Sequence, residues 1–199
     1  MYCVHCVLLL THALSCCLYR FHTGDMGILD DNGFLKVTGR IKEQYKLENG
    51  KYVVPTPIEE AITMSRFIHQ AVLAGANRPH NVALLVPDWD AVRTELGITS
   101  SSLDDNDDLV HDKRVRFLLD AEITAHCYKV KKFEIPTRWA IVAPFTAENN
   151  MLTPKMSVRR HKVIETYQDI IDNLYHDGHG TTAAAQPAQD GDQEKQAAY

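Results

Sequence analysis

Two Asn-Gly turns restrict the first part of the chain to short antiparallel hairpins. Asn-Gly suits the positive φ angles of a hairpin turn, because glycine has no Cβ that would clash there. The first turn joins residues 26–29 to residues 34–38, where apolar and polar residues alternate as they do in a strand. The second turn joins residues 44–47 to residues 52–54. The sequence therefore predicts two short β-hairpins before residue 55.

Helical and extended patterns alternate after these hairpins. Thr56 is placed to cap a helix, with Pro57 at the first helical position and two glutamates near the positive end of the helix dipole. Asp88 is placed to cap a second helix that ends at Gly97. The other predicted segments are strands over 68–76, 82–86 and 139–142 and helices over 112–131 and 158–175. The predicted fold class is α+β, with a small mixed β-sheet and packed helices.

The two ends differ in composition from the rest of the chain. Residues 1–20 are apolar and contain four of the five cysteines. This segment fits the apolar region of a signal peptide, a CxxC metal or redox site, a buried strand, or a stretch outside any folded unit. Residues 178–199 contain no Leu, Ile, Val, Phe or Trp. We therefore expect a disordered tail over 177–199, since nothing there offsets the entropy of ordering the chain.

Charge and length exclude several classes of protein. A chain of 199 residues is long enough for one domain of ordinary size. Its net charge of −5 argues against binding to the phosphates of nucleic acid. The sequence contains no run of 18 apolar residues, so it does not predict a membrane-spanning helix. The acidic stretch 104–108 lacks the central glycine and distal glutamate of a calcium loop, so we expect a solvated loop and no metal site.

Four short stretches carry polar residues that packing alone does not require. In the last of these stretches, residues 150–160, Lys155, Arg159 and Arg160 lie close to a predicted helix start. Cations are unfavourable there because the helix N-terminus is the positive end of the dipole. An anion nearby would remove that conflict. The four stretches are 22–27, 39–43, 46–55 and 150–160.

In this order, the stretches resemble the C-terminal portion of the acyl-adenylate-forming enzymes, and among these the long-chain acyl-CoA synthetases. The ribose-contact and hinge region of that family is similar to FHTGDMGILDDNGFLKVTGRIKEQYKLENGKYVVPTPIEEAI, and its closing motif is similar to WAIVAPFTAENNMLTPKMSVRRHKVIETY. The resemblance implies that residues 21–41 end an N-terminal adenylate-binding domain and that residues 42–176 form a C-terminal lid. Residues 1–20 do not resemble the family.

The resemblance implies a ligase reaction in two steps. ATP and a fatty acid form an acyl-AMP and pyrophosphate, and the thiol of CoA then attacks the acyl-AMP to give the thioester. Asp25 would accept hydrogen bonds from the two ribose hydroxyls, because a carboxylate offers paired acceptors. Thr23 and Gly24 would belong to the same cofactor-binding segment, and Arg40 would hold the ribose or phosphate region. Mg²⁺ would enter with ATP rather than through ligands from this chain.

The resemblance assigns catalytic roles within the lid. Lys42 stands at the hinge position, and Lys46 and the loop at Gly50 would face the active site in the CoA-accepting orientation. The family's adenylation lysine stands three residues after a Thr-Pro pair, where this chain has Ser157. Lys155 is two residues earlier and would share a face with Ser157 in an extended segment, so the adenylation lysine is either displaced to Lys155 or lost.

The family's phosphate loop, fatty-acid tunnel and large N-terminal domain have no counterpart in the 20 residues before Phe21. We therefore expect a fragment of a fatty acid–CoA ligase that is inactive alone. Its expected partners are fatty acid, ATP, CoA and a missing N-terminal adenylation domain. The alternative is a free-standing lid that binds a separate adenylation domain or another partner. The expected location is cytoplasmic, or peripheral on an intracellular membrane.

Overall fold

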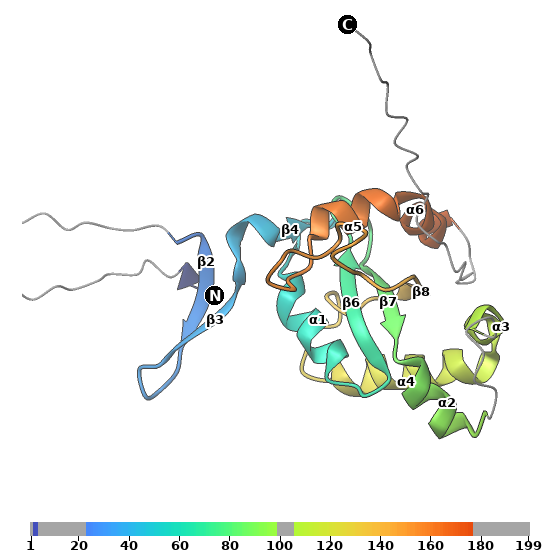
Figure 1. The fold of residues 1–199 in the computed structure, drawn as a ribbon. Coiled ribbons are helices and arrows are strands. Elements are labelled where there is room, and N and C mark those ends of the chain that lie inside the picture. Colours follow the sequence, from blue (N-terminus) through green and yellow to red (C-terminus); the bar gives the residue numbers. More distant parts are fainter. Residues whose placement is uncertain (1, 4–22, 99–105, 177–199) are drawn as a thin grey trace, which may run out of the picture.

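The structure is a computed structural model, and it describes residues 2–3, 23–98 and 106–176. The chain contains both helices and strands, with the short strands gathered at its start and paired helices at its end (Figure 1). In chain order the elements are β1 (Tyr2–Cys3), β2 (Asp25–Leu29), β3 (Leu35–Arg40), the 3₁₀ helix η1 (Ile41–Glu43), β4 (Tyr45–Lys46), β5 (Tyr52–Val53), α1 (Pro55–Thr63), β6 (Ile68–Ala74), β7 (Val82–Pro87), α2 (Trp89–Leu96), α3 (Asn106–His111), α4 (Lys113–His126), β8 (Arg138–Ile141), α5 (Arg160–Thr166) and α6 (Gln168–His176).

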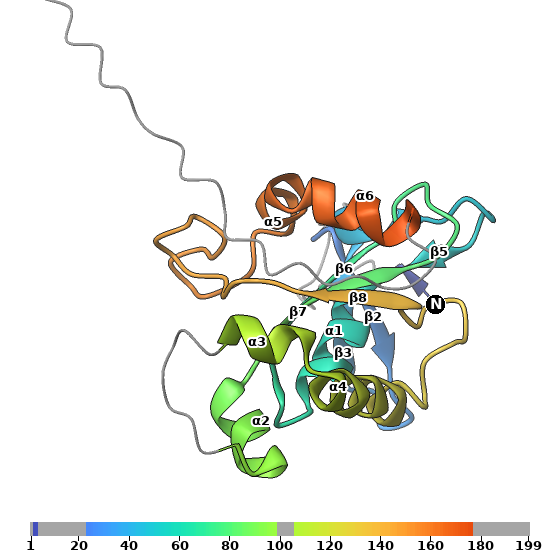
Figure 2. The same ribbon diagram turned by 90° about the vertical axis from the view of Figure 1, so that its right-hand side faces the viewer.

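A mixed sheet in the order β6-β7-β8 forms the centre of the domain. β7 pairs antiparallel with β6 and parallel with β8. Figure 2 shows α5 and α6 on one face of this sheet, and α1 and α4 on the other. Because both faces are covered, every residue of β7 is buried, and Leu84 and Leu85 join separate apolar clusters. The predicted small mixed sheet with packed helices is confirmed.

The two predicted hairpins are also confirmed. β2 and β3 form an antiparallel pair at one side of the domain (Figure 1). Their turn uses a positive φ of 83° at Gly33, and the Asp30 carboxylate accepts the backbone N–H of Phe34 at 2.8 Å. β4 and β5 form the second hairpin, whose turn uses a positive φ of 83° at Gly50.

Two predicted helix ends are wrong. α1 has Val54 as its N-cap, so Thr56 lies inside the helix and does not cap it. The Thr56 hydroxyl instead donates to Glu43 Oε2 at 3.3 Å, a tertiary contact that competes with the local one. The helix predicted over 112–131 is α4, which starts directly after its N-cap Asp112 but ends at His126 rather than continuing to residue 131.

Further along the chain, the predicted cap of α2 is confirmed, because Asp88 Oδ1 accepts the N–H of Ala91 and Gly97 ends the helix with a φ of 65°. The predicted single helix over 158–175 is wrong. It is divided into α5 and α6 at Tyr167, whose backbone leaves the helical region while its ring is buried against Phe145. The predicted loop at 104–108 is wrong in part, since 106–108 belong to α3.

Several expectations fall on residues outside the described part of the chain. Of residues 1–20, only Tyr2 and Cys3 are described, and they pair with β2. The cysteine-rich remainder and the expected tail at 177–199 lie outside the described residues. Over the described ranges, no helix is both long enough and apolar enough to cross a membrane.

Candidate functional site

The nucleotide-binding residues predicted from the sequence meet where the β2–β3 hairpin approaches the hinge. Asp25 and Arg40 are direct partners in the strand register, and Arg40 Nε lies 3.8 Å from Asp25 Oδ1. Thr23 Oγ1 accepts the N–H of Asp25 at 3.1 Å, and Gly24 turns the chain with a φ of 77°. The Asp25 and Arg40 side chains are 38% and 73% exposed, so both can reach a ligand.

The chain changes partners at η1, where the predicted hinge lies. The N–H of Ile41 donates to the Gly24 carbonyl at 2.8 Å, so Ile41 is tied to the hairpin. Glu43 accepts from Thr56 at 3.3 Å, so Glu43 is tied to α1. Lys42 lies between these two attachments and is exposed. A pivot at Lys42 would therefore leave both hydrogen bonds intact.

Lys46 and Gly50 are adjacent in space, as the sequence requires of a short hairpin. A Cβ added to Gly50 would lie 3.8 Å from Lys46 Cε. The Lys46 ammonium lies 6.0 Å from the centre of the Tyr52 ring, at the outer limit of a cation–π contact. Lys46 is exposed, so its charge is available to an anionic ligand.

Lys155 lies in a tight turn rather than in the extended segment assumed from the sequence. Thr153 closes this turn through its N–H, which donates to the Ser157 carbonyl at 2.8 Å, and through its hydroxyl, which accepts the Ser157 N–H at 3.2 Å. Met156 has a φ of 61° at the corner. The assumption that Lys155 and Ser157 share a face of a strand is therefore wrong. The Lys155 side chain is exposed at the tip of the turn.

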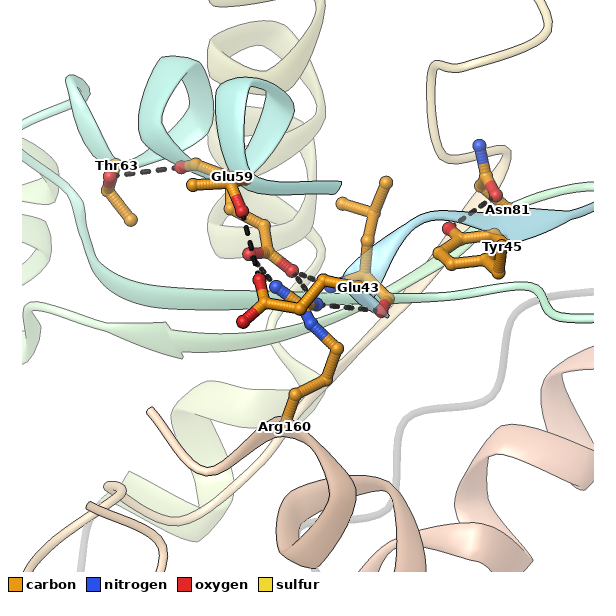
Figure 3. A network of polar contacts seen from close by, with 8 residues as sticks. Glu43, Tyr45, Glu59, Thr63, Asn81 and Arg160 are labelled. Carbon is orange, nitrogen blue, oxygen red and sulfur yellow. Dashed lines mark hydrogen bonds and ion pairs between the residues drawn. The ribbon is translucent and has the colours of Figure 1, made fainter. Parts of the chain in front are cut away.

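The anion expected near the basic residues at 155–160 is a side chain of the protein itself. Arg160 reaches from the start of α5 to Glu59 in α1 (Figure 3), with Nη2 2.6 Å from Glu59 Oε2 and a second contact between Nη1 and Oε1. Arg160 Nη1 also donates to the Leu73 carbonyl at 3.3 Å, and Glu59 Oε1 accepts the Leu73 N–H at 2.5 Å. Both charged side chains are less than one-fifth exposed.

Electrostatics favours the charged form of Arg160. Burial pulls the pKa of the Arg160 guanidinium down, but the hydrogen bonds and charge of Glu59 and the charge of Glu43 outweigh it. The net pKa of Arg160 lies above its ordinary value. Arg160 is therefore used to hold α5, with the turn that precedes it, against α1.

Tyr45 lies near this network and makes a separate polar contact with Asn81 (Figure 3). Its hydroxyl donates to Asn81 Oδ1 at 2.7 Å, and Asn81 Nδ2 donates to the Glu134 carbonyl at 2.8 Å. Burial, followed by the negative charge of Glu59, raises the pKa of Tyr45 well above its ordinary value. The backbone is close to this contact, since a Cβ on Gly75 would lie 2.5 Å from Asn81 Oδ1. Tyr45, which follows η1, is thus tied through Asn81 to the segment before β7 and to the segment before β8.

The candidate residues occupy three separate places: the start of β2 with the end of β3, the β4–β5 hairpin, and the turn before α5. Among the described residues, no hydrogen bond or ion pair joins Asp25 or Arg40 to Lys46 or Lys155. The described ranges also contain no cluster of three or more His, Cys, Asp or Glu side chains that could hold a metal. Sequence reasoning missed the Glu59–Arg160 pair, because the two residues are 101 positions apart and each has an ordinary local explanation.

Comparison with known proteins identifies similar chains. Residues 42–179 match the family model described as AMP-binding enzyme C-terminal domain. Fatty acyl-CoA synthetase A of Dictyostelium discoideum is 33% identical over 161 residues, which is 78% of this chain and 24% of that protein. Long-chain-fatty-acid–CoA ligase FadD15 of Mycobacterium tuberculosis is 32% identical over 162 residues, 78% of this chain and 26% of that protein. This chain therefore spans about a quarter of the length of these relatives.

A solved structure has the same fold. The adenylation domain of a carboxylate reductase from Mycobacterium chelonae superimposes with a TM-score of 0.65 at 23% identity. The superposition covers 79% of this chain and 23% of that one.

Proposed function

Because this chain belongs to the acyl-adenylate-forming AMP-binding enzymes, whose C-terminal domain it carries, we propose that it is the lid of an ATP-dependent fatty acid–CoA ligase. Both relatives described above are named for the activation of fatty acids. The structural observation that carries the proposal is the pairing of Asp25 with Arg40 directly before the η1 segment. This pairing supports a nucleotide contact by Asp25 close to the proposed pivot at Lys42.

In the first half-reaction, ATP and a fatty acid give acyl-AMP and pyrophosphate, with Mg²⁺ entering on ATP. Asp25 accepts hydrogen bonds from both ribose hydroxyls, which suit the two acceptor oxygens of a carboxylate. Arg40 orients that carboxylate from 3.8 Å and adds a positive charge toward the ribose or phosphate. Thr23 and Gly24 support the contact, because Thr23 accepts the Asp25 N–H and Gly24 sets the turn.

Lys155 supplies the positive charge for adenylation in place of the lysine that the family has at Ser157. Its exposed ammonium stands at the tip of the 153–157 turn, where it is free to approach an α-phosphate. A cation placed there stabilises the negative charge that develops between the carboxylate and the phosphate. The Arg160–Glu59 pair supports this role, because it fixes the base of the turn to α1.

In the second half-reaction, the lid rotates and the CoA thiol attacks the acyl-AMP, which releases AMP. Lys42 is the pivot, since Ile41 is bonded to the hairpin and Glu43 to α1. The rotation brings Lys46 and the Gly50 loop toward the active site, where the exposed Lys46 ammonium meets the phosphates of CoA. One domain thus serves two reactions with two different faces.

The remaining parts of the active site come from an N-terminal adenylation domain. Supporting this, five apolar residues of the β2–β3 hairpin are between 42% and 73% exposed, more than an isolated domain usually leaves in one place. The relatives are also about four times as long as the matching segment. We propose that this domain covers the hairpin, and that the 199 residues alone are inactive. The five residues are Ile28, Leu29, Phe34, Leu35 and Val37.

The same exposed hairpin supports a second candidate function, a free-standing lid that docks on a separate adenylation domain. The two cases differ in whether the domains must be covalently joined. Two samples distinguish these candidate functions. One is a fusion of this chain to the N-terminal domain of the Dictyostelium relative, and the other is a mixture of the two separate pieces.

The measurement is fatty-acid-dependent exchange of labelled pyrophosphate into ATP. We expect exchange from the fusion, none from the chain alone, and loss of exchange on Asp25→Ala. Exchange from the mixture at micromolar concentrations would establish the free-standing lid. A folded fusion that exchanges no pyrophosphate, with any fatty acid from C8 to C20, would refute the adenylation role. The proposed setting is cytoplasmic or peripheral on an intracellular membrane.

A further inference from the structure

α4 has an outward side that the ligase proposal does not use. Val115, Leu119 and Ile123 form the buried stripe of this helix. On the other side, Phe117 is 77% exposed, and Tyr128, in the turn after the helix, is 73% exposed. Burial of a large aromatic ring normally stabilises a fold, so two rings left in water around one helix indicate a surface that meets something else.

Basic residues surround these two rings. Residues 113–132 contain six Lys and Arg against two acidic residues, in a chain whose net charge is −5. Both acidic side chains accept hydrogen bonds from residues outside α4. Asp120 accepts from Trp139 Nε1, and Glu122 accepts from Ser65 Oγ at 2.6 Å. The lysines at 113, 129, 131 and 132 are exposed, so the outward charge is positive.

We propose that this surface docks on an anionic lipid bilayer. We define the α4 surface by Lys113, Phe117, Tyr128, Lys129, Lys131 and Lys132. Membrane-surface helices combine aromatic rings, which enter the headgroup layer, with Lys and Arg, which attract anionic lipids. Both features are present here on α4 and the segment that follows it.

The dimensions of α4 suit a helix that lies flat on a membrane. Its 14 residues extend about 21 Å, with Phe117 in the first half and Tyr128 just beyond the end. Anchors at both ends favour an orientation parallel to the bilayer. A hollow of about 480 Å³ between α2 and α4, lined in part by Leu96, Phe117 and Leu118, adds apolar area beside the first anchor.

Docking through this surface is compatible with the proposed lid. Figure 2 shows α4 on the face of the sheet opposite to α5 and α6. The turn that carries Lys155 leads directly into α5, and the β2–β3 hairpin stands apart from α4 at the side of the domain (Figure 1). A bilayer under α4 therefore leaves the face with α5, and the turn before it, open to an adenylation domain and its substrates.

The test is sedimentation of the 199-residue chain with vesicles of phosphatidylcholine alone or with 30% phosphatidylserine. We expect binding to the phosphatidylserine vesicles that weakens when salt is raised from 0.1 M to 0.5 M. Lys129→Gln and Lys132→Gln should each lower the partition coefficient about fivefold, the equivalent of about 1 kcal/mol per basic residue near an anionic surface. Phe117→Ser with Tyr128→Ser should lower it by about tenfold or more.

Phe34→Ser is the matched control, because Phe34 is 73% exposed but belongs to the β2–β3 hairpin. It should leave vesicle binding unchanged, and a thermal melt verifies that each variant is folded. The proposal is overturned if Phe34→Ser abolishes binding while the α4 variants bind normally. Equal binding to uncharged vesicles also overturns it, as does binding to heparin or RNA without binding to vesicles. The assay needs no ligase activity, so its failure would not bear on the proposed reaction.

Discussion

Removal of the Glu59 carboxylate should destabilise the lid far more than removal of an exposed carboxylate. Glu59 and Arg160 side chains are 12% and 17% exposed, and Glu59 also accepts the N–H of Leu73 at 2.5 Å. Glu59→Ala leaves a guanidinium in a largely dry site and a backbone donor without its acceptor. Loss of one partner of a buried pair costs about 3–5 kcal/mol. Because both side chains remain partly exposed, we expect the free energy of unfolding to fall by about 3 kcal/mol, the lower end of this range.

The assay is urea unfolding followed by tryptophan fluorescence, which reports on Trp89 and Trp139. The control is Glu95→Ala, which removes the partner of Arg66 in an ion pair whose side chains are 46% and 69% exposed. An exposed pair contributes at most about 1 kcal/mol, so the two variants should differ by about 2 kcal/mol or more. Equal midpoints for Glu59→Ala and Glu95→Ala would refute the reasoning that burial makes the pair costly to break.

A double mutant separates the ion pair from simple loss of volume. Glu59→Gln keeps an oxygen acceptor for the Leu73 N–H but leaves the charge of Arg160 unpaired. Arg160→Met removes that charge and keeps most of the side-chain volume. The double variant should therefore be less destabilised than the sum of the two single variants, by about 1 kcal/mol or more. Additive effects would contradict a direct interaction between the two charges.

Three further predictions follow from individual contacts. Burial, followed by the charge of Arg138, lowers the pKa of His80 below 6.5, so the unfolded state binds more protons and stability is lost as pH falls through the lowered pKa. His80→Phe should reduce the difference between urea midpoints measured at about pH 7 and about pH 5; an unchanged difference would contradict this. Tyr45→Phe removes the donor to Asn81, and should cost about 1–3 kcal/mol in the same unfolding assay. Gly39→Ala should lower the melting temperature, because Gly39 has a φ of 157° and its Cβ would lie 2.8 Å from Val54 Cγ1; an unchanged melting temperature would contradict this.

Local signals were sufficient for most elements of the fold. The Asn-Gly turns located both hairpins, because a positive φ at glycine is a property of the turn itself. Asp88 and Gly97 marked the two ends of α2 for the same reason, since a cap depends on neighbouring backbone groups. The Asp25–Arg40 pair could be expected because both residues lie at one end of a single hairpin.

The errors arose where distant parts of the chain meet. Thr56 has a residue type suited to capping, but Glu43 takes its hydroxyl and α1 starts earlier. Apolar periodicity continues across Tyr167, so this pattern does not indicate the break between α5 and α6. The Lys155 turn is a local exception, because it is closed by backbone and hydroxyl contacts between Thr153 and Ser157 that spacing does not indicate. The Glu59–Arg160 pair joins two elements whose proximity only the tertiary fold creates.

The most direct test of the central claim is thioester formation by the fusion with the Dictyostelium N-terminal domain. The measurement is labelled palmitoyl-CoA formed from palmitate, ATP and CoA, for the fusion and for its Lys155→Ala variant. The account predicts ATP- and CoA-dependent product from the fusion and a loss of about 100-fold or more in the variant, the scale of removing one transition-state contact. A folded fusion that binds ATP but forms no palmitoyl-CoA would contradict the claim that this chain is the lid of a fatty acid–CoA ligase.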